Sequence, residues 1–211
     1  MGCAQSSPFI RPRRYDYVTD LESKQRPISK RRSVPQHEFL SEQEKELLVG
    51  TWQRLADDPV GIGIDVFLRI FQLAPDARHA FPSFSCLTDT QLVDNVVFRS
   101  HATRFVRAVD FVMSNLNALD IIVVENLVRL GRHHCAAVCE FRVEYLEVFE
   151  AAMTDVWAQR LGVDCFDAAT RHAWSKIFRL ITSHVRDGYN DYKSATMKIV
   201  AAANGGKQHS E

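Results

Sequence analysis

The sequence predicts an all-α fold, and three observations support this prediction. Between residues 41 and 189, several segments repeat apolar side chains at helical spacing. Capping residues, prolines and a glycine, which start and end helices, separate these segments. No segment shows the strict alternation of apolar and polar residues that a half-buried strand requires. With 211 residues, 46% of them hydrophobic, the chain is long enough to bury one core.

Composition divides the chain into three parts. Residues 1–36 contain four prolines, eight basic and three acidic residues without an apolar repeat, so we expect a disordered basic tail. One helical domain is expected over residues 37–190, followed by a frayed tail over residues 191–211. The chain beyond residue 36 holds 18 basic and 23 acidic residues. This acidic balance argues against nucleic acid as a partner.

The first two predicted helices carry start signals. Ser41 and Glu44 form a capping box, in which each side chain accepts a hydrogen bond from the other residue's backbone N–H. Pro59 suits the first turn of a second helix, since a proline there loses no helical hydrogen bond. The expected inward residues of these two helices are Leu47, Leu48, Thr51, Trp52 and Leu55, and then Val60, Ile64, Phe67 and Phe71.

The middle of the chain is expected to contain a short helix, a corner and a long helix. Pro75 starts the short helix, and residues 80–84 form a corner with two phenylalanines. The long helix is predicted over about residues 91–116. Its expected inward residues are Val97, His101, Phe105, Val109, Val112 and Leu116.

Two further helices close the domain. One is predicted over about residues 141–161 and ends at Gly162. The other spans residues 167–189, with Asp167 as its N-cap. The expected inward residues are Tyr145, Leu146, Phe149 and Met153 in the first, and Trp174, Ile177, Phe178, Ile181 and Val185 in the second.

The helix predicted over residues 119–134 ends on a histidine. His134 shares a face with Leu127 and Leu130, in an apolar repeat that begins at Ile121. A histidine near a helix C-terminus is more often a capping cation than a metal ligand. His101, 33 residues earlier on another amphipathic helix, raises the weight of the ligand interpretation. Neighbouring helical residues point about 100° apart, so the apolar stripe favours His134 over His133 as the ligand.

The N-terminus matches the pattern for N-myristoylation, with Gly2 as the acceptor. Cys3 can carry a palmitoyl group, and the basic tail would be attracted to anionic lipids. One myristoyl chain binds membranes only marginally, so a second signal is needed for stable anchoring. We therefore expect a peripheral, lipid-anchored protein at the cytoplasmic face of a membrane, most simply the plasma membrane. The alternative is a basic tail without acyl groups.

The five cysteines show no CxxC or zinc-like spacing. No apolar run reaches the roughly 18 residues of a transmembrane helix, and the N-terminus lacks the apolar core of a secretory signal. We expect reduced thiols in an intracellular protein. Cys135 and Cys139 are either redox-active or buried and inert.

Over about residues 41–189 these features, in this order, resemble the globin family, and most closely its neuroglobin and globin X branch. The Met-Gly-Cys start and the long basic extension resemble globin X, a lineage linked to acyl-anchored membrane attachment. The resemblance implies the globin fold, a three-on-three helical sandwich. The matching elements are Trp52, Phe67-Leu-Arg-Ile-Phe-Gln-Leu-Ala-Pro75, Phe81, His101, Leu130-Gly-Arg-His-His134 and Ala169-Thr-Arg-His-Ala-Trp174.

The resemblance further implies a haem b cofactor, with His134 as the proximal iron ligand and His101 as the distal one. Burial favours the neutral imidazole that ligation requires. The walls that an apolar porphyrin needs are expected from Phe67, Phe81, Phe84 and Phe105 on the distal side and Leu130, Phe141, Leu146 and Phe178 on the proximal side. Arg104 is the candidate partner of a haem propionate, the alternative being a solvated surface arginine.

One residue departs from the globin pattern. The position four residues after His101, commonly valine in globins, is Phe105 here. A phenylalanine ring would reduce the space for a diatomic ligand, which argues against simple oxygen storage. A one-residue shift would place Val106 inward instead.

Four functions follow from these expectations. The leading one is a bis-histidyl, hexacoordinate globin that acts in electron transfer or in sensing of oxygen or nitric oxide, with an electron-transfer partner not identified by the sequence. The second is a reversible oxygen carrier or store. The third is nitrite reduction or nitric oxide dioxygenation, which would need an outside reductant because the chain shows no reductase domain. The fourth is a helical interaction module without cofactor. The expected small ligands are oxygen, nitric oxide, carbon monoxide and nitrite.

Overall fold

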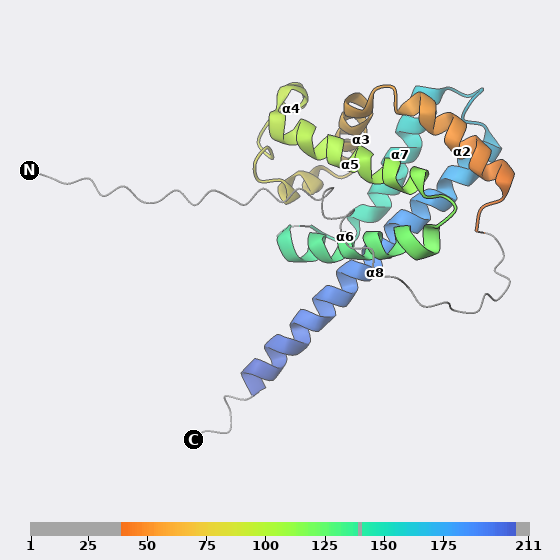
Figure 1. Cartoon of the computed structure of the whole chain (residues 1–211). Coiled ribbons are helices and arrows are strands. Elements are labelled where there is room, and N and C mark those ends of the chain that lie inside the picture. Colours follow the sequence, from red (N-terminus) through yellow and green to blue (C-terminus); the bar gives the residue numbers. More distant parts are fainter. Residues whose placement is uncertain (1–38, 139–140, 206–211) are drawn as a thin grey trace, which may run out of the picture. The chain divides into compact units, whose positions relative to one another are not determined.

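The computed structural model describes residues 39–138 and 141–205, with side chains through residue 202, and in this part of the chain it is all-α (Figure 1). The predicted fold class is therefore confirmed. The basic tail with Gly2 and Cys3, as well as Cys139, lies outside the described residues. The elements are α2 (Glu42–Leu55), α3 (Pro59–Leu73), η1 (Pro75–Ala80), α4 (Asp89–Asp94), α5 (Val96–Ser114), η2 (Leu119–Val123), α6 (Val124–Ala137), α7 (Tyr145–Leu161) and α8 (Ala168–Gly205).

Local capping starts and ends the helices largely as predicted. At α2, the N–H of Ser41 donates to Glu44 Oε2 at 2.8 Å, and the N–H of Glu44 donates to Ser41 Oγ at 3.2 Å. At the start of α8, the N–H of Thr170 donates to Asp167 Oδ1 at 2.8 Å. Gly162 ends α7 with a φ of 74°, a conformation that favours glycine.

The long helix predicted over residues 91–116 is two helices, α4 and α5. The Asn95 side chain accepts a hydrogen bond from the N–H of Phe98 at 3.0 Å and thereby starts α5. The buried residues of α5 are Phe98, Ala102, Val106, Val109, Val112 and Met113. The prediction that Val97 points inward was wrong, since 49% of this residue is exposed.

The helix predicted from residue 119 begins with a wider turn, η2. The N–H of Val124 donates to the carbonyl of Leu119, five residues earlier, so the turn contains one residue more than an α-helical turn. Leu119 and Val123 are buried in a row that continues four residues later with Leu127, whereas Ile121 is 59% exposed. The prediction that Ile121 begins the buried stripe was therefore wrong.

Helix α6 packs against α8 (Figure 1), and two glycines lie at this contact. A Cβ atom at Gly131 would overlap the carbonyl oxygen of Val185, and one at Gly188 would overlap that of Val128. The two backbones therefore approach more closely than any larger side chain would allow. Helix α8 continues beyond Tyr189 to Gly205, farther than predicted, because residues 190–204 contain neither proline nor glycine.

Three tryptophans from α2, α7 and α8 form a cluster within the core. Trp52, Trp157 and Trp174 lie with ring centroids 5.5–6.2 Å apart. The indole N–H of Trp174 donates to Thr51 Oγ1 at 2.9 Å, which joins α2 to α8. None of the helices within the described residues combines the length and the apolarity needed to cross a bilayer.

Candidate functional site

A cluster of aromatic rings lies between α3, α5 and the corner after η1. Phe67 on α3 is buried, and its ring contacts the rings of Phe81, Phe98, Phe105 and Phe149 at centroid distances of 5.9–6.2 Å. These contacts are steep, edge-to-face arrangements, which aromatic rings favour. The cluster gives α5 an apolar wall on the side that carries His101.

His101 lies at the edge of this cluster. Its ring is 4.9 Å from that of Phe67 and 4.8 Å from that of Phe81. Burial, and next the charge of Arg104, lower the pKa of His101 to about 3. Repulsion from a charged His134 is the third cause, so the two imidazoles are within electrostatic range of each other although they belong to different helices. His101 is therefore neutral near pH 7.

His134 is held in one tautomer by its own helix. Its Nδ1 lies 2.9 Å from the carbonyl oxygen of Leu130. A carbonyl only accepts, so Nδ1 carries the proton and Nε2 keeps its lone pair. Burial lowers the pKa of His134 as well, which favours the neutral ring. The ring of Phe141 covers it at 5.0 Å.

His133 is turned away from its neighbour. The two rings are 6.1 Å apart with planes at 81°, as expected for successive residues on a helix. Burial, and next Arg104, lower the pKa of His133. Arg104 on α5 thus lies within electrostatic range of both α6 and His101, and its Nη1 donates to Ser100 Oγ at 3.0 Å.

The other predicted distal residues gather around the same cluster. Phe84 is buried and stacks on Phe81 at 5.0 Å. Phe105 contacts Phe67 and Phe149, so its ring faces the wall against which His101 packs. Val106 is also buried. Phe105 and Val106 are therefore not alternatives for one inward position, and Phe105 belongs to the side of α5 that carries His101.

The predicted proximal residues divide into two groups. Leu130 and Phe141 contact His134 through the hydrogen bond and ring contact given above, and Leu146 is buried at the start of α7. Phe178 instead packs on Trp157 and Trp174, with centroids 5.7 and 5.5 Å away. Its role as a haem contact stays a prediction.

Two rings of the cluster were not among the predicted site residues. Phe149 was expected to face inward, but its place opposite Phe105 depends on how α7 packs against α3, which no local pattern gives. Phe98 was missed although it lies seven residues before Phe105, a spacing that places both residues on one face of a helix.

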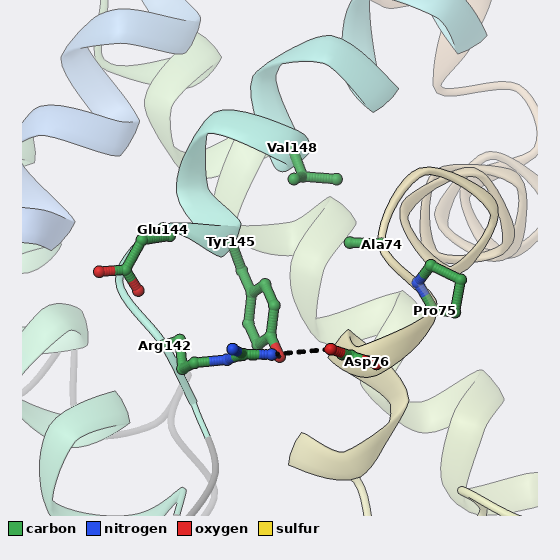
Figure 2. A pocket seen from close by; sticks show the side chains of 7 residues that line it. All are labelled: Ala74, Pro75, Asp76, Arg142, Glu144, Tyr145 and Val148. Atoms are coloured by element: carbon green, nitrogen blue, oxygen red, sulfur yellow. Dashed lines mark hydrogen bonds and ion pairs between the residues drawn. The ribbon is translucent and has the colours of Figure 1, made fainter.

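Separately, a pocket of about 560 Å³ opens between η1 and the start of α7 (Figure 2). Arg142 donates to the Tyr145 hydroxyl at 2.7 Å and to Asp76 Oδ2 at 3.2 Å, so the guanidinium bridges the two elements. The lining residues are Ala74, Pro75, Asp76, Arg142, Glu144, Tyr145 and Val148, and they include none of the predicted site residues.

The histidine pair and its surroundings fit a porphyrin that holds iron. His101 and His134 are neutral imidazoles on separate helices and would hold the iron of a haem, which would supply one-electron redox chemistry. Phenylalanine rings line the side of His101, and Phe141 covers His134. Arg104 adds a cation at the same place, of the kind that a propionate would pair with.

Comparisons with known proteins bear on the family of this chain. The family model described as Globin matches residues 64–185, more than half of the chain. A neuroglobin of Dissostichus mawsoni is 28% identical over 153 residues, which cover 72% of this chain and 94% of that protein. Cytoglobin-2 of Danio rerio is 25% identical over 157 residues, covering 73% and 85%.

A solved structure is also similar. It is a hexacoordinated haem protein from an anhydrobiotic tardigrade, determined at pH 4. The match has a TM-score of 0.68 and 25% identity, and it covers 75% of this chain and 99% of that one. The predicted globin fold is therefore confirmed, and the chain belongs to the globin family.

Proposed function

We propose that this globin binds haem b, with His134 as the proximal and His101 as the distal iron ligand in the resting protein. The observation that carries the proposal is the pair of neutral imidazoles on α5 and α6, one of which has its Nε2 lone pair fixed by the Leu130 carbonyl. The similarity to a hexacoordinated haem protein supports it. When bound, haem iron supplies one-electron redox chemistry and a position for small ligands.

The chain's own residues would orient the ligands and exclude water. The Leu130 carbonyl holds the ring of His134, as outer hydrogen-bond partners do for metal-bound histidines. Phe67 and Phe81 pack on His101 and restrict its movement. Arg104 would pair with a propionate at the rim.

This arrangement favours electron transfer or redox sensing over oxygen storage. An internal His101 ligand competes with oxygen, nitric oxide, carbon monoxide or nitrite. The apparent affinity for each outside ligand is therefore its intrinsic affinity multiplied by the fraction of sites that are open. Two histidine ligands can be kept in both oxidation states, which suits exchange of electrons with a partner protein. The ring of Phe105 further limits the distal space.

Titration of the haem-free protein with haemin tests cofactor binding directly. We expect a Soret band that saturates at one haem per chain, with weaker binding in His134→Leu. A protein that stays folded yet develops no Soret band would contradict the proposal and favour an interaction module without cofactor.

We further propose that acyl groups on Gly2 and Cys3, together with the basic tail, anchor the protein to the cytoplasmic face of the plasma membrane. The sequence pattern and the two-signal requirement support this. Co-expression with an N-myristoyltransferase should add the mass of one myristoyl group and allow flotation with anionic vesicles. Gly2→Ala should abolish both, whereas unmodified protein that floats equally well would contradict a lipid anchor.

A further inference from the structure

The side chain of Arg104 lies against Nδ1 of His101, whereas Nε2 is the nitrogen that would coordinate iron. Its Nη2 is 3.4 Å from His101 Nδ1, and its Nη1 is anchored on Ser100 Oγ at 3.0 Å. A guanidinium has donors only and stays charged. In this contact, Nδ1 of His101 must therefore be the acceptor.

His101 is consequently in the tautomer opposite to that of His134. A neutral imidazole carries one proton, so when Nδ1 accepts a hydrogen bond, the proton resides on Nε2. An Nε2–H group can donate a hydrogen bond to a ligand in the distal space, and its proton must move to Nδ1 before Nε2 can coordinate iron. His134, with its proton on Nδ1, is ready to coordinate.

We propose that Arg104 is a positioning residue that selects the tautomer of His101 and thereby opposes ligation of the iron by this histidine. This rests on the proposed function, since it requires bound haem. While Arg104 holds Nδ1, the site is open to an outside ligand. When Nη2 leaves Nδ1, the proton moves from Nε2 to Nδ1 through solvent, without net uptake, and His101 can coordinate.

Three substitutions at one position separate the possible roles. Lysine keeps a donor, methionine offers neither donor nor acceptor, and glutamate offers only an acceptor, which would stabilise a proton on Nδ1. The equilibrium constant for His101 binding to ferrous iron is obtained from carbon monoxide rebinding after flash photolysis. We expect this constant to be near the wild-type value in Arg104→Lys. In Arg104→Met it should be about threefold to tenfold higher, which corresponds to the loss of one hydrogen bond. It should be highest in Arg104→Glu.

Arg107, one turn farther along α5 and exposed, provides the matched control. Arg107→Met removes the same charge and should leave the constant unchanged. The rate of haem loss to an acceptor protein is the second readout. If Arg104 only paired with a propionate, Arg104→Met would lose haem faster with an unchanged His101 constant, and this result would overturn the proposal.

The outcome is distinguishable from failure of the proposed function. A protein without a Soret band would contradict haem binding itself. If the wild type binds haem but is five-coordinate, Arg104→Glu should still shift it toward the low-spin, six-coordinate spectrum. Absence of such a shift in a variant that retains haem would overturn the role of Arg104.

Discussion

His101 and His134 differ in which groups the protein places on their Nδ1 atoms. The backbone carbonyl of Leu130 accepts from Nδ1 of His134, whereas the guanidinium of Arg104 lies against Nδ1 of His101. The backbone carbonyl that holds His134 is present whatever the side chain of residue 130. The donor that holds His101 is the side chain of Arg104, which a substitution can remove. His101 is therefore the histidine of the pair whose tautomer a side-chain substitution can change.

We expect His134→Gly to lose the wild-type haem spectrum and to regain it when imidazole is added, because free imidazole can occupy the space of the missing ring. His133→Ala, altered one residue earlier on the same helix, should keep the wild-type spectrum. An absorption titration with imidazole at fixed haem and protein concentrations measures this. Loss of the spectrum in His133→Ala, with His134→Gly unaffected, would reverse the assignment of the proximal ligand.

The haem-free protein should lose stability as the pH falls from 6.5 toward about 3. Burial lowers the pKa of His101 from 6.5 to about 3, so in this range the unfolded chain binds a proton that the folded chain does not. The contribution of His101 to the free energy of unfolding is fully present above pH 6.5 and is lost as the pH falls to about 3. This contribution is at most about 5 kcal/mol. Urea unfolding across this pH range should show a weaker dependence in His101→Leu. Equal slopes in both proteins would contradict the burial of a neutral His101.

At the scale of elements, the position of His134 depends on the glycine contact between α6 and α8. Gly131→Ala should destabilise the protein by about 1–3 kcal/mol, as overpacking commonly does, because the new methyl group meets the backbone of Val185. Haem should also be lost faster, since α6 carries His134, the proposed proximal ligand. Urea unfolding and haem transfer measure the two effects.

Gly50 provides the matched control for this substitution. It lies in helix α2, and a Cβ atom there meets nothing within 4 Å. Gly50→Ala should therefore stabilise the protein by about 0.5–1 kcal/mol. Destabilisation of similar size by Gly50→Ala and Gly131→Ala would show that the close contact is not the cause.

The helix starts and ends could be predicted where one or two side chains decide them. The Ser41–Glu44 capping box, the Asp167 cap and the Gly162 end are local signals, and all three hold in the structure. Asn95 was missed because apolar residues continue at helical spacing on both sides of it. Periodicity alone therefore merged α4 and α5 into one helix.

The candidate site was predictable in composition but not in detail. The histidine pair and most of the phenylalanines follow from spacing and family resemblance. The wider turn η2 has no sequence signature, and the buried row on this side contains Leu119, Val123 and Leu127 rather than a stripe that begins at Ile121. The Arg104–His101 contact and the place of Phe149 arise from side-chain packing across helices, which periodicity does not describe.

At the scale of the whole molecule, the globin core is separable from the end of α8. Residues 190–202 are exposed, and Tyr192, Met197, Ile199 and Val200 are apolar residues among them. Truncation after residue 193, which keeps the contact of Lys193 with the ring of Tyr189, should change the free energy of unfolding by less than about 1 kcal/mol. A larger loss in urea unfolding would show that the extension contributes to the core.

The measurement that most directly tests two imidazoles on one iron is the absorption spectrum of the ferrous, haem-loaded protein without added ligand. The wild type should show a low-spin, six-coordinate spectrum, and His101→Leu should show a high-spin, five-coordinate one. A wild type that is already five-coordinate, with a spectrum that His101→Leu leaves unchanged, would contradict bis-histidyl ligation.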